Sequence, residues 1–135
     1  IGGTKGVIGH VGDSRVYLVR NGQCHRLTGD HTLISAQLKA GTITKEQAAT
    51  SPYRNVITRA VGIQESVQVD TLIVDAVPGD IFVLCSDGLH GYLNDDEVAS
   101  VVASAPLAEL PERFIDLANE RGGKDNITAV LVEID

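Results

Sequence analysis

The chain has 135 residues, of which 43% are hydrophobic and 21% are charged, a composition typical of one folded domain with its own core. The net charge of −7 argues against nucleic acid or an anionic membrane surface as a partner, because both attract basic proteins. No apolar run approaches the roughly 20 residues that a membrane span needs, and no signal peptide opens the sequence. Two isolated cysteines, Cys24 and Cys85, predict reduced thiols and a cytoplasmic location. Because the chain starts at Ile1 within folded-looking sequence, we interpret it as a piece of a longer protein.

The first residues predict three antiparallel strands, over 5–12, 15–20 and 23–28. Between the second and third strands lies Asn21-Gly22, which is typical of a type I′ hairpin turn.

Two short helices follow in the predicted order. The first covers 31–40 and ends before Gly41, a residue suited to a helix C-terminus. The second covers 45–50, where Thr44 and Gln47 form a capping box.

The rest of the chain predicts strands first and then helices. Five consecutive apolar residues over 81–85 predict a central strand that is buried on both faces. The other expected elements are strands over 55–62 and 67–74, a helix after the Asn94–Glu97 capping pair, a helix over 108–121 and a last strand over 126–134. This order predicts the α+β class or a layered sandwich.

Three aspartates occupy equivalent places, each at the boundary between a strand and a turn: Asp13, Asp87 and Asp125. If these boundaries share one edge of the fold, the carboxylates converge, repel one another and raise each other's pKa. A cluster of oxygen ligands is what Mg²⁺ or Mn²⁺ prefers. Each aspartate taken alone is more typical of a turn residue, and only the shared placement favours a metal site.

Several competing chemistries require residues that this sequence does not have at the required spacing. A cysteine phosphatase needs an arginine six positions after its cysteine, where this chain has Gly91 after Cys85 and Asp30 after Cys24. There is no Asp-x-Asp of the haloacid-dehalogenase type and no P-loop. The four histidines show no zinc spacing, so we interpret them as surface or turn residues.

Six short motifs follow one another along essentially the whole chain. They are Val11-Gly12-Asp13-Ser14-Arg15, Leu27-Thr28-Gly29-Asp30-His31, Asn55-Val56-Ile57-Thr58-Arg59-Ala60-Val61-Gly62, Pro78-Gly79-Asp80, Leu84-Cys85-Ser86-Asp87-Gly88-Leu89 and Gly122-Gly123-Lys124-Asp125-Asn126-Ile127-Thr128. In this order they resemble the metal-dependent serine/threonine protein phosphatases of the type 2C (PPM) family, the bacterial branch in particular.

This resemblance implies part of an α/β/β/α sandwich, mostly antiparallel, with helices outside. It implies hydrolysis of phosphoserine and phosphothreonine, in proteins that serine/threonine kinases phosphorylate, by water activated at two Mn²⁺ or Mg²⁺ ions. Asp87 and Asp125 would act catalytically as ligands of the core ions, and Asp13 would help to hold a third ion with Asp87. The region 31–54 would form a flap over the site.

The resemblance also implies that residues 1–135 form the C-terminal half of the catalytic domain. The half that precedes it in the family carries an Asp-Gly-x-Gly-Gly motif, which this sequence lacks. We therefore expect the segment alone to be inactive and one sheet face or edge to be uncovered. Two alternatives stay open: a non-catalytic regulatory or adaptor module, and a phosphatase of the sporulation-regulator type.

Overall fold

A computed structural model describes residues 4–51, 56–60, 66, 68–123 and 125–135. Their strands form two sheets, one of four strands in the order β3-β2-β5-β6 and one of two strands, β1 and β4. The elements are β1 (Thr4–His10), β2 (Arg15–Arg20), β3 (Gln23–Arg26), α1 (Leu33–Ala40), α2 (Lys45–Thr50), β4 (Asp70–Ala76), β5 (Ile81–Cys85), α3 (Asp87–His90), α4 (Asp95–Ala103), the 3₁₀ turn η1 (Leu107–Glu109), α5 (Leu110–Glu120) and β6 (Ala129–Glu133).

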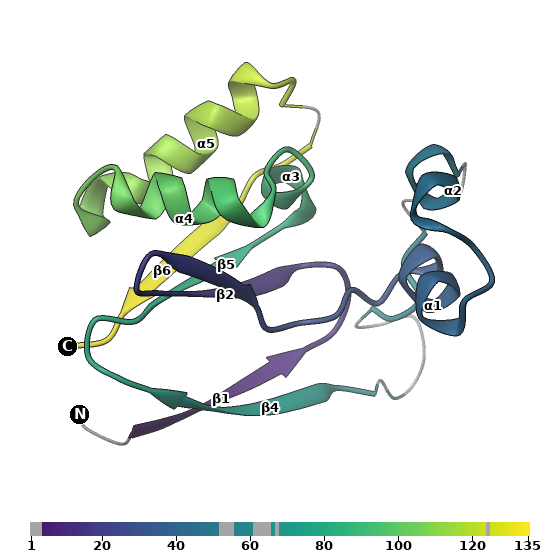
Figure 1. Ribbon diagram of the computed structural model, residues 1–135, viewed down its shortest axis with the longest axis horizontal. Helices are drawn as coiled ribbons and strands as arrows, with labels where there is room; N and C mark the ends of the chain where they lie inside the picture. The colour runs from purple at the N-terminus through teal and green to yellow at the C-terminus, as the bar shows by residue number, and fades with distance from the viewer. Residues whose placement is uncertain (1–3, 52–55, 61–65, 67, 124) are drawn as a thin grey trace.

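The described elements form three layers. Helices α4 and α5 lie on one side of the four-stranded sheet, the β1–β4 ribbon lies on the other, and α1 and α2 stand to one side (Figure 1). This arrangement confirms the predicted mixed fold of antiparallel strands with helices outside. Every helix among the described residues is too short or too polar to cross a bilayer.

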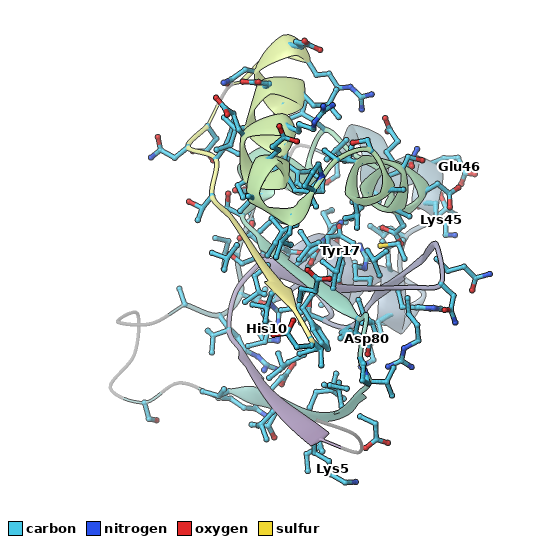
Figure 2. The ribbon with its side chains drawn as sticks, turned by 90° about the vertical axis from the view of Figure 1, so that its left-hand side faces the viewer. Lys5, His10, Tyr17, Lys45, Glu46 and Asp80 are labelled. Carbon is cyan, nitrogen blue, oxygen red and sulfur yellow. The ribbon has the colours of Figure 1, made fainter. Side chains whose placement is uncertain are left out.

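The main core lies between the four-stranded sheet and the helices. Tyr17 on β2, Val83 on β5 and Phe114 on α5 are all fully buried there. Figure 2 shows Tyr17 on this helical side, while Lys5 lies at the outer end of the two-stranded ribbon. Burial of these large side chains supplies the main driving force for holding β5 in the centre of the sheet.

The predicted central strand is observed, but its burial on both faces is confirmed only in part. Val83 and Cys85 face the helices and are 0% and 5% exposed. On the other face, Phe82 packs with Ala76 of β4, whereas Leu84 is 39% exposed. The two-stranded ribbon therefore covers only one part of this face, and the apolar surface near Leu84 lies open in the described chain.

The prediction that the chain opens with three antiparallel strands in succession is wrong for β1. β2 and β3 form the expected hairpin, and the positive φ values of Asn21 (52°) and Gly22 (75°) match its type I′ turn. β1 instead pairs with β4 in the other sheet. The turn over 11–14 thus carries the chain from one sheet to the other. The local sequence of β1 does not reveal which strand it pairs with.

The helix ends agree with the sequence. Thr44 and Asn94 each form the predicted capping box, and Gly41 ends α1 with a φ of 76°.

The strand predicted over 55–62 lies partly outside the described residues. Within the described part, Ile57 makes a single bridge to Thr32 and no strand forms.

The turn between β4 and β5 is held by a buried charge. Asp80 is 1% exposed and accepts two hydrogen bonds from the guanidinium of Arg20, at 2.8 and 2.7 Å. It also accepts one from the Val77 N–H at 3.0 Å. Because β4 and β5 belong to different sheets, this carboxylate joins the two sheets at the end opposite the turn over 11–14.

We predict that Gly88→Ala destabilises the fold. A Cβ at position 88 would lie 2.1 Å from the carbonyl oxygen of Asn126, so the two segments could not approach as closely as they do. The expected cost is about 1–3 kcal/mol, the usual size for overpacking, seen as a lower melting temperature. Gly29→Ala is the control, because a Cβ at position 29 would have no neighbouring atom within 4 Å. Equal melting temperatures for the two variants would contradict the prediction.

Candidate functional site

The strand register brings two of the predicted acids to one edge. In the antiparallel β2–β5 pair, Arg15 lies opposite Cys85. Asp13 precedes Arg15 by two residues and Asp87 follows Cys85 by two, so both acids emerge at the same end of this pair. Asp13 lies in the turn before β2, and Asp87 is the first residue of the one-turn helix α3.

The segment before β6 reaches the same edge. Cys85 is also paired with Ala129, the first residue of β6. Next to this pair, the Ser86 N–H donates to the Thr128 carbonyl oxygen, and the Thr128 N–H donates to Ser86 Oγ, both at 3.1 Å. The three strand boundaries that carry Asp13, Asp87 and Asp125 therefore share one edge of the four-stranded sheet.

Asp13 and Asp87 interact unfavourably as charges. Burial raises the pKa of Asp13, and the negative charge of Asp87 and a hydrogen bond between the two carboxyl groups raise it further. No ion pair between described residues involves Asp13, Asp87 or Asp125. Closely spaced carboxylates that lack a positive partner suit a divalent cation, so the donor set at this edge is chemically compatible with Mg²⁺ or Mn²⁺.

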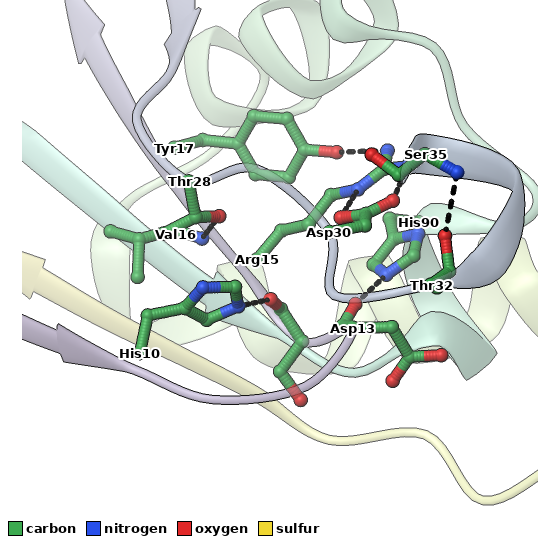
Figure 3. A network of polar contacts seen from close by, with 11 residues as sticks. His10, Asp13, Arg15, Val16, Tyr17, Thr28, Asp30, Thr32, Ser35 and His90 are labelled. Atoms are coloured by element: carbon green, nitrogen blue, oxygen red, sulfur yellow. Dashed lines mark hydrogen bonds and ion pairs between the residues drawn. The ribbon is translucent and has the colours of Figure 1, made fainter. Parts of the chain in front are cut away.

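Arg15, two residues after Asp13, is held by another carboxylate. Arg15 donates two hydrogen bonds to Asp30, at 2.9 and 2.6 Å, and one to the Tyr17 hydroxyl at 3.1 Å (Figure 3). Burial by itself would raise the pKa of Asp30, but the hydrogen bonds and charge of Arg15, together with the charges of His90 and Arg26, outweigh burial and lower the pKa. Sequence reasoning did not find this pair, whose members lie 15 residues apart.

Histidines approach the site more closely than the sequence suggested. The prediction of surface or turn positions is wrong for His10 and His31, which are 8% and 7% exposed. His90 donates from Nε2 to the Asp13 carbonyl oxygen at 2.6 Å (Figure 3). These contacts join elements far apart in sequence, and no spacing pattern could have indicated them.

A second group of potential metal ligands consists of His10, His31 and Asp70, whose ligand atoms all lie within 4.8 Å of one another. The acids Asp13, Asp87 and Asp125 do not form such a compact set in the described structure. However, His31 Nδ1 accepts the Gly12 N–H at 2.9 Å, so the proton of the neutral ring must be on Nε2. That nitrogen lies 2.6 Å from Asp70 Oδ2, to which it donates. In this tautomer His31 has no lone pair left for a metal. It is hydrogen-bonded to Asp70, and the His10 ring only packs against it, with ring centroids 4.6 Å apart.

Comparison with known proteins gives a consistent result. No family model matches the chain. A serine/threonine phosphatase (Stp) of Listeria monocytogenes is 43% identical over 130 residues, which are 96% of this chain and 52% of that protein. A putative 2C-type protein phosphatase of Streptococcus pyogenes is 43% identical over 130 residues, which are 96% of this chain and 53% of that protein. The chain belongs to the type 2C phosphatase family. The family resemblance of the six motifs is thereby confirmed.

Solved structures of serine/threonine phosphatases superpose closely on the chain. The serine/threonine phosphatase of S. agalactiae is 40% identical with a TM-score of 0.93, and the match covers 100% of this chain and 56% of that one. The catalytic domain of the phosphatase PstP, in a structure with two manganese ions, is 31% identical with a TM-score of 0.81, covering 98% and 55%. The chain spans about half the length of the relatives it matches.

Asp125 combines a turn contact with an exposed position. Its Oδ1 accepts the N–H of Asn126 at 2.7 Å, as expected of an aspartate in a turn. The residue is otherwise exposed at the edge it shares with Asp87. Its role as a metal ligand, like those of Asp87 and Asp13, stays a prediction from the type 2C motifs.

We predict that Asp13→Asn stabilises the metal-free protein at pH 7. The folded pKa of Asp13 lies above its ordinary value of 3.8, so ionisation costs stability, and this cost appears as the pH rises from 3.8 through the folded pKa. In the presence of a chelator, the variant should melt at a higher temperature than the wild type at pH 7. This advantage should shrink as the pH falls towards 4.

The exposed acid Asp116 on α5 provides the control, since Asp116→Asn should leave the metal-free melting temperature unchanged both at pH 7 and near pH 4. A metal-free Asp13→Asn protein that melts below the wild type at pH 7 would show that Asp13 stabilises the turn and that charge repulsion is unimportant.

Proposed function

We propose that this chain is the C-terminal half of the catalytic domain of a metal-dependent protein phosphatase that hydrolyses phosphoserine and phosphothreonine in proteins. The observation that carries the proposal is the pair of facing carboxylates, Asp13 and Asp87, placed by the β2–β5 register at the edge that Asp125 also reaches. A purely binding module gains nothing from such a repulsion, so the pair favours the enzyme over the adaptor alternative.

Open apolar surface between the sheets supports the proposal that a second half completes the domain. A cavity of about 360 Å³ lies between the two-stranded ribbon and the four-stranded sheet, lined by Val7, Leu84 and Val132 among others. A neighbouring cavity of about 410 Å³ extends to the site edge at Ser14 and Ser86. Further strands that fill this space would bury the exposed apolar side chains, which the described residues alone leave uncovered.

Each acid has a proposed role. Asp87 and Asp125 would hold the core ions, and Asp13 with Asp87 would hold a third ion, either Mn²⁺ or Mg²⁺. When bound, such ions lower the pKa of a water molecule and stabilise the charge that develops on the phosphoryl group. The PstP structure with two manganese ions supports this choice of metal. Within this chain, the register of β5 against β2 and β6 sets the spacing of the carboxylates.

The substrates we propose are proteins phosphorylated by serine/threonine kinases, and the location we propose is the cytoplasm. The naming of relatives as serine/threonine phosphatases supports the substrate class. The location is supported by two thiols, Cys24 and Cys85, that form no disulfide. Burial raises the pKa of Cys85 to about 12, so this cysteine is an inert part of the core and no candidate nucleophile.

Paired substitutions test the proposed function in the full-length protein that carries this segment. We predict that Asp87→Asn and Asp125→Asn each lower the rate of hydrolysis of a phosphothreonine peptide with Mn²⁺ by about 100-fold or more. The double variant should lose little beyond the single variants, because the two acids act as one unit. The exposed acid Asp96 on α4 is the control, and Asp96→Asn should keep full activity. Substantial turnover by the double variant would refute the assignment.

A further inference from the structure

The backbone of the turn that carries Asp13 is held by imidazole side chains from three different parts of the chain. His10, at the end of β1, donates from Nε2 to the Ser14 carbonyl oxygen at 2.7 Å. His90, in α3, donates from Nε2 to the carbonyl oxygen of Asp13 itself at 2.6 Å. Figure 3 shows these two rings approaching the turn from opposite sides.

His31 makes the most extensive contact with this turn, because it binds both backbone groups of one residue. Its Nδ1 accepts the Gly12 N–H at 2.9 Å, and its backbone N–H donates to the Gly12 carbonyl oxygen at 2.7 Å. Gly12 is buried and has a φ of 106°, a conformation that side-chain-bearing residues rarely adopt. The residue next to Asp13 is thus fixed entirely through its peptide groups.

The turn needs such support because it is no hairpin. It links β1 to β2, and these strands belong to different sheets, so no ladder of strand hydrogen bonds fixes its geometry. Buried peptide groups in such a crossing must find other partners. His31 meets this need at Gly12, directly before the carboxylate that faces Asp87.

Two further charged groups set the tautomer of His31. Since Nδ1 accepts from Gly12, Nε2 carries the proton and donates to Asp70 Oδ2 at 2.6 Å. The other oxygen of Asp70 accepts from Arg59 at 2.7 Å. The hydrogen bonds from His31 and then from Arg59 lower the pKa of Asp70 to about 2, so it stays an acceptor over the whole physiological range. A chain of contacts therefore runs from Arg59 through Asp70 and His31 to the backbone of Gly12.

The same histidine closes the base of the helical segment α1–α2. Its carbonyl oxygen accepts the Thr58 N–H at 2.8 Å, and the adjacent Thr32 forms the isolated bridge to Ile57. One residue consequently connects the Asp13 turn to both ends of the segment that stands beside the sheets in Figure 1.

We propose that His31 is a positioning residue for Asp13: by binding both backbone groups of Gly12, in a tautomer set by Asp70 and Arg59, it aims the Asp13 carboxylate at the ion shared with Asp87. The inference rests on the proposed function, because it concerns the ion that Asp13 would hold. His31 itself touches neither ion nor substrate.

Two replacements of His31 separate its two side-chain hydrogen bonds in the full-length protein. The amide oxygen of His31→Asn lies near the position of Nδ1 and can still accept from Gly12, but this side chain is too short for Asp70. The longer His31→Gln can still donate to Asp70 and leaves the Gly12 N–H without its acceptor. We measure bound Mn²⁺ by equilibrium dialysis, together with the Mn²⁺ concentration for half-maximal hydrolysis and the metal-free melting temperature.

We expect His31→Gln to weaken the binding of the Mn²⁺ shared by Asp13 and Asp87 by about 10–100-fold, the usual effect of removing an outer partner of a metal ligand. His31→Asn should recover most of this affinity although it lacks the bond to Asp70. His25→Gln is the control, because His25 is exposed on β3. Should both replacements lower the melting temperature equally while Mn²⁺ affinity stays at the wild-type value, His31 is a structural residue and the proposal is wrong.

A second variant keeps the proposal testable if the His31 variants do not fold. Asp70 is half exposed at the start of β4, so Asp70→Ala should fold. In this variant His31 loses the acceptor that sets its tautomer, so binding of the same Mn²⁺ should weaken by a smaller factor. Asp75→Ala removes an equal charge from the same strand and should leave the affinity unchanged. Equal Mn²⁺ affinities in these two variants would contradict the positioning role. A wild-type protein that binds no Mn²⁺ would overturn the proposed function, and the positioning role with it.

Discussion

The repulsion between the carboxylates of Asp13 and Asp87 is the constraint around which the surrounding structure is arranged. The β2–β5 register holds the two acids at one edge, and the buried core behind β5 supplies the stability that this arrangement requires. Other features at this edge keep the repulsion uncompensated. Arg15 is bound by Asp30, and the histidines contact the turn through its backbone, so among the described residues no cation forms an ion pair with the Asp13 carboxylate.

The same edge explains two features that have no evident purpose in isolation. Gly88 has no side chain because the carbonyl of Asn126 passes so close to it, and this approach brings the segment with Asp125 beside α3. Gly12 adopts a positive φ because the chain must pass from one sheet to the other just before Asp13. In both cases a glycine makes possible a close backbone path, which in turn places an acid.

Local chemistry in the sequence was sufficient for many elements. The Asn21-Gly22 hairpin and the capping boxes at Thr44 and Asn94 depend on residues within four positions of one another, and all three are observed. A common edge for the three acids was only a condition raised by their shared placement between a strand and a turn, and the register of β5 against β2 and β6 meets it. Motif order, a non-local signal, was enough to identify the type 2C family.

What the sequence did not predict depends on contacts between distant segments. Nothing within β1 indicates that its partner is β4, and the exposure of Leu84 on a wholly apolar strand depends on how far the β1–β4 ribbon extends. The buried roles of His10 and His31 depend on hydrogen bonds to peptide groups and to Asp70, which is 39 residues from His31. Such partners are set by the tertiary fold, and no residue spacing reports them.

The central claim is that the acids at the strand edge hold the metal and that the nearby histidine network does not. Anomalous scattering from manganese, in crystals of the full-length protein grown with Mn²⁺, tests this claim most directly. We predict anomalous peaks in contact with the carboxylates of Asp87 and Asp125, and His31 Nε2 still hydrogen-bonded to Asp70. A manganese peak on His31 Nε2, or the absence of any peak beside Asp87, would contradict the account.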